Sequence, residues 1–156
     1  MFGFLKRKVR EVKAPVDGEV VALSEVKDEV FSQGLAGGGV AIRPVSDTFC
    51  APISGKVSRI FATNHAYSIK SEKDLEVLVH IGLDTVALGG KGFERLAEEG
   101  DEVEAGDAVI KADLSFLGGQ AKDTITPIII TEESDVKNIE KKLRIAKSGD
   151  VIMEVN

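Results

Sequence analysis

The chain of 156 residues has little of what cross-links or stacks a small protein. It contains one cysteine and no tryptophan, and aromatic residues make up 5% of it. A single cysteine, Cys50, excludes an internal disulfide and is typical of a protein from the reducing cytosol. Phe49 and Ala51 beside it favour burial of the thiol as a small apolar group. We therefore expect a cytoplasmic protein with a core of Val, Ile, Leu and Ala side chains.

Long apolar runs and an excess of positive charge are also lacking. No run reaches the roughly 20 apolar residues that a membrane-spanning helix needs. The 26 acidic residues outnumber the 20 basic residues, which gives a formal net charge of −6. Because phosphate backbones require a basic surface, this balance excludes nucleic acid as a partner and favours a basic protein. The apolar and basic start of the chain predicts only a weak direct contact with an anionic membrane.

Short runs with strand character, separated by turn residues, fill most of the sequence. Sixteen glycines agree with many turns, and two turn-to-strand segments recur, 14–20 at 51–57 and 106–110 at 149–153. The strands that we expect span residues 18–23, 39–43, 56–62, 65–70, 75–81, 108–112, 125–131 and 151–155. We expect short helical segments over 91–99 and 132–139. The pattern predicts an all-β fold, a compact antiparallel β-sandwich or barrel with one or two short helices.

The length is that of one ordinary domain. We expect residues 14–156 to form this domain and residues 1–13 to be a short, flexible segment that is both basic and apolar. The run Gly37-Gly38-Gly39 is not followed by the Gly-Lys-Ser/Thr of a phosphate-binding loop. It is therefore interpreted as a tight turn into a strand.

Both histidines of the chain lie in one predicted β-hairpin, fifteen positions apart. A four-residue loop, 71–74, places Lys70 opposite Leu75 and consequently His65 opposite His80. Directly opposed residues of an antiparallel pair share one face, with Cβ atoms roughly 4.5–5.5 Å apart. Two imidazoles at that distance are able to share one small anion or one metal ion. The prediction depends on the loop length, because a shift of one residue would place the rings on opposite faces.

The neighbouring residues leave two interpretations of the histidine pair open. Thr63 shares the predicted face with His65, and Gly82, its cross-strand partner, leaves room beside the hydroxyl. Asp84 follows His80 with the H-x-x-x-D spacing of metal ligands, so a zinc-dependent hydrolase using His65, His80 and Asp84 is one alternative. The H-x-H pair of such hydrolases is absent, and no further histidine remains for catalysis. A single strand histidine is most often structural, but the pairing of both favours a functional site.

Several blocks of sequence are more specific than the histidine spacing. They are A-P-V-D-G-E-V at 14–20, G-V-A-I-R-P at 39–44, T-N-H-A-Y-S-I at 63–69, V-L-V-H-I-G-L-D-T-V-A-L at 77–88 and K-G-F-E at 91–94. With these blocks the chain, from about Ala14 onward, resembles the glucose family of enzyme IIA, a component of the bacterial phosphoenolpyruvate-dependent sugar phosphotransferase system. The resemblance implies an antiparallel β-sandwich with a shallow, apolar-rimmed depression at the histidine pair.

The resemblance also implies a phosphotransferase component with a phosphohistidine intermediate. His80 matches the residue that accepts a phosphoryl group on Nε2 from the phosphocarrier protein HPr. The group then passes to a cysteine on the enzyme IIB domain of a sugar permease, which supports sugar uptake and phosphorylation. His65 matches the neighbour that stabilises the phosphoryl group, and Thr63 matches the hydroxyl that orients His65. No cofactor is required, although a regulatory zinc ion bound by His65 and His80 is an alternative.

The same resemblance implies a surface for basic partners. Asp28 and Asp84 match acidic residues that flank the site and meet arginines of the partner. The apolar docking rim is implied to consist of Val30, Leu35, Ala36, Phe61, Leu78 and Val86. Besides HPr and enzyme IIB, the partners that the resemblance implies extend to regulatory targets such as glycerol kinase. Membrane contact is expected mainly through the permease. A non-catalytic regulatory binding module on the same fold is a further alternative.

Overall fold

The computed structural model describes residues 9–72 and 74–156, and residues 1–8, where membrane contact was considered, lie outside them. The strands are β1 (Arg10–Lys13), β2 (Gly18–Ala22), β3 (Gly38–Pro44), β4 (Thr48–Cys50), β5 (Gly55–Ile60), β6 (Ala66–Lys70), β7 (Glu76–His80), β8 (Phe93–Arg95), β9 (Glu102–Val103), β10 (Ala108–Ala112), β11 (Thr126–Ile130), β12 (Ile139–Lys141), β13 (Ile145–Ala146) and β14 (Val151–Val155). The helices are α1 (Glu29–Ser32) and α2 (Leu114–Gln120), with short 3₁₀ turns η2 (Leu23–Glu25) and η3 (Thr85–Leu88). In the described part of the chain, no helix is both long and apolar enough to cross a membrane.

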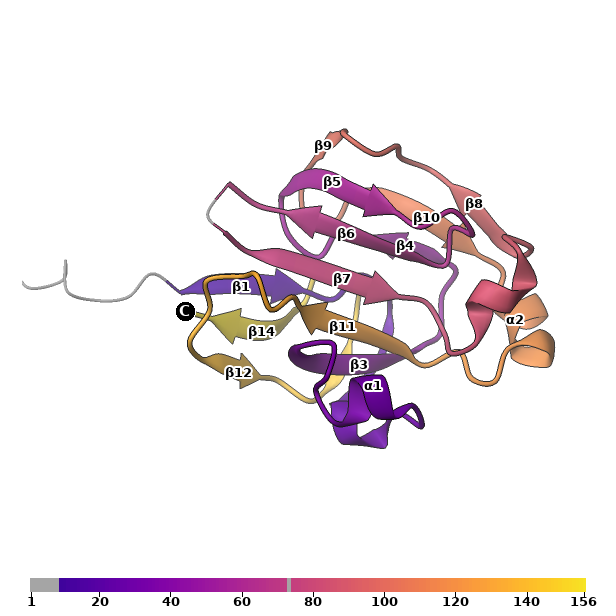
Figure 1. The fold of residues 1–156 in the computed structure, drawn as a ribbon, viewed down its shortest axis with the longest axis horizontal. Helices are drawn as coiled ribbons and strands as arrows, with labels where there is room; N and C mark the ends of the chain where they lie inside the picture. Colours follow the sequence, from indigo (N-terminus) through magenta and orange to yellow (C-terminus); the bar gives the residue numbers. More distant parts are fainter. Residues whose placement is uncertain (1–8, 73) are drawn as a thin grey trace, which may run out of the picture.

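The strands form antiparallel sheets that enclose one main core (Figure 1). Within the described residues, an eight-stranded sheet has the order β13-β2-β3-β11-β7-β6-β5-β9, and two three-stranded sheets have the orders β1-β14-β12 and β4-β10-β8. The main core joins all three, since it includes Val12 of β1, Phe49 of β4, Tyr67 of β6, Ile110 of β10 and Ile152 of β14. The predicted all-β sandwich with short helices is therefore confirmed.

The strand predictions are more accurate than the helix predictions. All eight predicted strands are confirmed, with ends that differ by at most two residues. The helix predicted over 91–99 is wrong, because Phe93–Arg95 pairs with β10 and is strand β8. The helix predicted over 132–139 is also wrong, and Ile139 begins strand β12. The two α-helices of the described chain lie where none was expected.

The repeated sequence segments fold in the same way. Ala14 N donates to Asp150 O at 2.7 Å, and in the second copy Ala51 N donates to Asp107 O at 2.8 Å. In each copy the glycine just before the aspartate donates back to the same alanine carbonyl at 2.9 Å. The repeat predicted from the sequence is therefore a pair of matching loop contacts, each leading into two strands.

A second, smaller core lies on the other face of the eight-stranded sheet. Along β7, Val77 and Val79 point into the main core, whereas Leu78 packs against the smaller cluster. This cluster includes Phe31 of α1 and Ile129 of β11. Because side chains alternate along a strand, His80 faces the same side as Leu78. In Figure 1, α1 lies beside β3, and its residue Phe31 packs against the His80 ring.

Candidate functional site

The two histidines are neighbours in the structure. Their ring centroids are 4.9 Å apart and their planes meet at 80°, an edge-to-face arrangement. His80 is the last residue of β7, and His65 lies one residue before β6. The predicted juxtaposition of the rings is therefore observed.

The hairpin register that we predicted is nevertheless wrong by one residue. Lys70 pairs with Glu76 rather than Leu75, and His80 pairs with Ala66 rather than His65. A continuous strand in this register would turn His65 toward the main core.

The chain avoids that outcome because His65 lies outside the regular strand. Asn64, just before it, has a left-handed φ of 59°, and the chain bends there. The His65 carbonyl still accepts a hydrogen bond from Ile81 N at 2.7 Å. Consequently Thr63 and Gly82 do not form the predicted cross-strand pair, since Thr63 lies in the turn. The bend, rather than the register, brings the rings together.

A backbone carbonyl fixes the tautomer of His80. Its Nδ1 lies 2.8 Å from Gly82 O, and a carbonyl oxygen only accepts, so the proton of the neutral ring is on Nδ1 and Nε2 carries a free lone pair. Burial lowers the pKa of His80 below its ordinary value, against the opposing effects of the Gly82 hydrogen bond and the Asp28 charge. The ring is therefore neutral at pH 7, with a nucleophilic nitrogen available.

Gly82 has no room for a side chain. Its φ is +77°, and a Cβ built there would lie 2.7 Å from Thr85 Cγ2 and 2.9 Å from Asp123 O. Both the backbone conformation and the close packing therefore require glycine. Glycine at this position is what brings the carbonyl to His80.

His65 is buried, with 4% of its surface exposed. Its Nδ1 lies 2.6 Å from the Thr63 hydroxyl, so the predicted partnership of these two residues is present in the structure. Burial, assisted by the proximity of His80, lowers the pKa of His65 from 6.5 to about 4. His65 is therefore also neutral at pH 7, with Nδ1 engaged by the hydroxyl.

Two phenylalanines pack against the histidine rings. The Phe61 ring, predicted in the rim, is 5.4 Å from that of His65, and the Phe31 ring is 5.0 Å from that of His80. Arg59 covers Phe61 with its guanidinium carbon 3.9 Å from the ring centroid. Sequence reasoning missed Phe31, because the helix α1 that carries it was not predicted. Its one signal is its place directly after the predicted rim residue Val30.

Three of the predicted rim residues are exposed apolar side chains. Val30, Leu35 and Val86 are 50%, 64% and 57% exposed, and they come from α1, the segment after it and η3. The other three predicted rim residues, Ala36, Phe61 and Leu78, are partly buried. Val30 adjoins Phe31, whose ring packs against His80, so apolar surface that the fold does not bury lies near this histidine.

The two predicted acidic residues have different settings. Asp28 is the N-cap of α1, where its carboxylate accepts from Val30 N at 3.0 Å, and its charge acts on His80. Asp84 is exposed, has a left-handed φ of 60° and precedes η3. In residues 9–72 and 74–156, no group of three His, Cys, Asp or Glu side chains is placed to hold a metal ion. The His65, His80 and Asp84 set of the zinc alternative is therefore not assembled.

Known proteins resemble this chain over most of its length. The family model described as phosphoenolpyruvate-dependent sugar phosphotransferase system, EIIA 1, matches residues 10–136. The PTS system glucose-specific EIIA component of Haemophilus influenzae is 43% identical over 154 residues, which cover 97% of this chain and 90% of that protein. The PTS system N-acetylglucosamine-specific EIICBA component of Klebsiella pneumoniae is 40% identical over 94% of this chain and 22% of its own length.

The likeness extends to three dimensions. The solved structure of glucose permease IIA from Mycoplasma capricolum matches with a TM-score of 0.91 and 41% sequence identity. The match covers 95% of this chain and 96% of that one. The fold is thus shared with a solved relative.

Proposed function

The chain belongs to the EIIA 1 family of the phosphoenolpyruvate-dependent sugar phosphotransferase system, and on that basis we propose that it relays a phosphoryl group on Nε2 of His80. The observation that carries the proposal is the Nδ1 contact with Gly82 O, which leaves Nε2 unprotonated. A neutral imidazole nitrogen is a good nucleophile toward phosphorus and a good leaving group. Transfer in and out of the site then costs little free energy, as a relay requires.

The transfer balances without moving a proton. The Nε2 lone pair of His80 attacks the phosphorus of phosphorylated HPr, an N–P bond forms, and the bond to the donor breaks with its electron pair returning to HPr. Positive charge grows on the His80 ring during attack. The Gly82 carbonyl, 2.8 Å from Nδ1, stabilises this charge through the N–H that it already accepts. Because the chemistry asks little else of the protein, catalysis consists of positioning and charge stabilisation.

His65 is proposed to hold the phosphoryl group rather than to carry it. If the Thr63 hydroxyl donates to Nδ1, the proton of neutral His65 is on Nε2, where it can donate to a phosphoryl oxygen. The ring separation of 4.9 Å puts the two imidazoles in contact, so a phosphoryl group on Nε2 of His80 would lie next to the His65 ring. Thr63 orients the ring in this scheme.

The partners are proposed to be HPr as donor and a cysteine of enzyme IIB as acceptor. The Klebsiella relative, named an EIICBA component, supports an IIB partner because its name joins the A component to B and C components. The exposed rim residues Val30, Leu35 and Val86 would exclude water during transfer, and Asp28 and Asp84 would pair with basic residues of the partners. One apolar surface would serve both partners in turn.

The proposal is tested by phosphorylation with phosphoenolpyruvate, enzyme I and HPr. The expected product is an acid-labile, alkali-stable phosphate on His80. His80→Gln should abolish acceptance, whereas His65→Gln should accept the group and donate it to enzyme IIB roughly 100-fold more slowly, since a missing transition-state donor costs about that much. Label on another residue, or normal donation by His65→Gln, would reject the respective assignment.

A further inference from the structure

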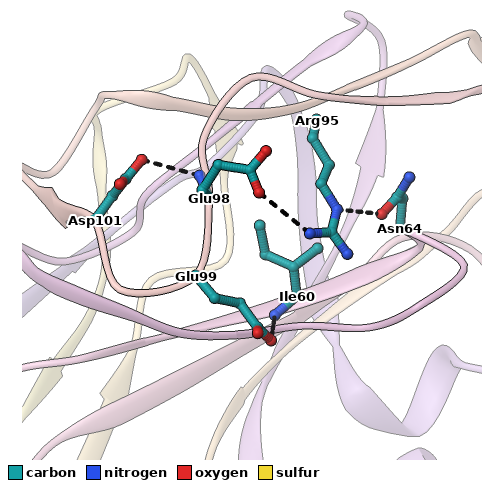
Figure 2. Close-up of polar contacts among 6 residues, drawn as sticks. All are labelled: Ile60, Asn64, Arg95, Glu98, Glu99 and Asp101. Atoms are coloured by element: carbon teal, nitrogen blue, oxygen red, sulfur yellow. Dashed lines mark hydrogen bonds and ion pairs between the residues drawn. The ribbon is translucent and has the colours of Figure 1, made fainter.

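We propose that Arg95 is a positioning residue for His65, acting through Asn64, an inference that rests on the proposed function. Arg95 Nε donates to Asn64 Oδ1 at 2.6 Å, and Figure 2 shows the guanidinium of Arg95 directed at the Asn64 side chain. Asn64 lies between Thr63 and His65, whose side chains are joined at 2.6 Å. The arginine therefore contacts the one residue whose backbone sets the separation of the Thr63 and His65 side chains.

The backbone at Asn64 has a conformation that needs support. Its φ of 59° is left-handed, which L residues adopt reluctantly, although asparagine tolerates it better than most. Asn64 N also donates to Phe61 O at 2.7 Å, which closes a tight turn. A charge-assisted hydrogen bond to the side chain of Asn64 holds this turn from outside. Without Arg95, the turn keeps the backbone hydrogen bond from Asn64 to Phe61 but loses the contact of Asn64 with residues 95–101.

The segment that carries Arg95 is itself fastened to β5. Ile60 N, at the start of the turn, donates to Glu99 Oε2 at 2.8 Å (Figure 2). Backbone bonds of 2.8 and 2.9 Å join Val57 to Gly100 and Asp101. Residues 95–101 therefore form hydrogen bonds with the turn at two places, at Ile60, where it begins, and at Asn64.

Charges around Arg95 indicate a geometric role. Arg95 Nη1 lies 3.4 Å from Glu98 Oε2, so the positive charge is partly balanced within its own segment. Glu98 N donates to Asp101 Oδ2 at 2.9 Å, which stiffens the loop beneath the ion pair (Figure 2). The guanidinium is thus engaged on both sides, by Glu98 and by Asn64. Its contribution is to hold His65, rather than to attract phosphate.

The test measures two properties of the full chain. They are the rates of phosphoryl transfer and the nitrogen NMR spectrum of the His65 ring. Arg95→Met and Asn64→Gly both remove the hydrogen bond, and glycine fits the left-handed φ without strain. Asn64→Asp keeps the acceptor and serves as the conservative variant. Arg144→Gln is the matched control, because it breaks another arginine–carboxylate pair, with Asp150 at 3.3 Å.

For Arg95→Met and Asn64→Gly we expect acceptance on His80 within about twofold of wild type and donation to enzyme IIB reduced roughly tenfold, less than the ~100-fold that an ångström of misplacement costs. The chemical shifts of the two His65 ring nitrogens should change from those of a single tautomer to an average over both tautomers. Asn64→Asp and Arg144→Gln should match wild type in both measurements. The double variant Arg95→Met/Asn64→Gly should be no slower than either single variant, since the two share one contact.

Unchanged donation together with unchanged His65 nitrogens in Arg95→Met would overturn the inference. Equal effects of Arg144→Gln would do the same, since they would indicate a general loss of stability. If the wild-type protein accepts no phosphoryl group, the proposed function fails instead. The His65 spectrum of the unphosphorylated variants then decides on Arg95 independently.

Discussion

At the scale of single residues, the site depends on two imidazoles that are kept neutral. Both pKa values are lowered, chiefly by burial, so neither ring competes for protons at pH 7. Each Nδ1 is occupied by a short contact, His80 with a carbonyl and His65 with a hydroxyl. The two Nε2 atoms are left with opposite tasks in the proposed mechanism, one as nucleophile and one as donor. Protonation of His80 on Nε2 would remove its lone pair and with it this division of roles.

The lowered pKa of His65 predicts a specific loss of stability in acid. Its pKa is 6.5 when unfolded and about 4 when folded, so below pH 6.5 the unfolded chain binds the extra proton. Stability should fall as the pH drops from about 6.5 to about 4 and should be unaffected above that window. The shift corresponds to about 3 kcal/mol. Urea unfolding at pH 7.5 and 4 should show this loss in the wild type.

The matched variant is His65→Gln, which keeps a polar side chain without a titrating group. Its free energy of unfolding should fall by about 3 kcal/mol less than that of the wild type over the same pH range. Other acidic groups titrate equally in both proteins, so the difference isolates His65. An identical pH dependence of the two proteins would show that the buried ring does not resist protonation.

The prediction from the sequence and the structure agree that the two histidines are neighbours. The sequence placed Thr63, His65 and His80 together, and the structure does so as well. The geometric reason was wrong, because the register is shifted by one residue and a bend at Asn64 compensates. A left-handed asparagine is a local backbone property that no period-two pattern encodes. Contacts between segments that are distant in the sequence, such as that of Arg95 with Asn64, also cannot be predicted from residue spacing.

At the scale of elements, the two copies of the loop repeat use the same side-chain contacts. Glu104 N donates to Asp107 Oδ2, and Lys147 N donates to Asp150 Oδ2, both at 2.9 Å. The first halves of the repeats match too, since Ser54 Oγ accepts from Ala105 N and Asp17 Oδ1 accepts from Ser148 N. Both copies lead into strands of the main core. The repeated sequence segments therefore correspond to the same loop hydrogen bonds before each pair of strands.

These matching contacts predict matching costs. Asp107→Ala and Asp150→Ala each remove one acceptor for a backbone N–H, and each should lower the free energy of unfolding by about 1 kcal/mol. Asp150→Ala should cost slightly more, because Asp150 also pairs with Arg144. Asp107→Asn and Asp150→Asn keep an acceptor oxygen and should lose less than half as much. Urea unfolding at pH 7 measures the free energy of unfolding of all four variants. An unchanged free energy for Asp107→Ala would contradict the proposed contribution of this loop contact to stability.

Element prediction succeeded where alternation and turns were clear and failed where tertiary pairing decides. Residues 91–99 have a helix-like spacing of apolar residues, but Phe93–Arg95 gains backbone partners on β10 and becomes a strand. Helix α1 has four residues and begins at its cap Asp28, too short for a periodic signal. Pro127 in β11 is tolerated because pairing with β7 begins only at Ile128. Short elements are set by their neighbours more than by their own sequence.

At the scale of the whole molecule, the buried core and the exposed apolar side chains lie in separate places. The main core lies between the sheets, whereas His80 faces the other side of the eight-stranded sheet, like Leu78, and packs against Phe31 of α1. Apolar surface is therefore exposed at Val30, Leu35 and Val86 without weakening the main core. In the proposed function this exposed apolar surface is where the partners dock. The net charge of −6 adds attraction for basic partners.

This separation predicts that a rim charge blocks partner binding while the fold is retained. Leu35, a proposed rim residue between α1 and β3, is 64% exposed, and Val45 is 75% exposed just beyond the other end of β3, about 20 Å along the strand. Leu35→Asp should weaken binding of HPr and enzyme IIB about tenfold or more, because a carboxylate would be desolvated inside an apolar contact. Val45→Asp introduces the same charge at a distant exposed site and should leave both affinities unchanged.

Calorimetric titration with each partner measures the affinities, and urea unfolding shows whether both variants keep wild-type stability. Equal weakening by the two substitutions would indicate that only the overall charge matters, which would contradict a localised docking surface. Weakening toward one partner alone would separate their footprints, with Leu35 assigned to that partner. Selective loss with Leu35→Asp toward both would mean that donor and acceptor occupy the same apolar surface in turn, so the phosphoryl group must be stored on the protein between two binding events.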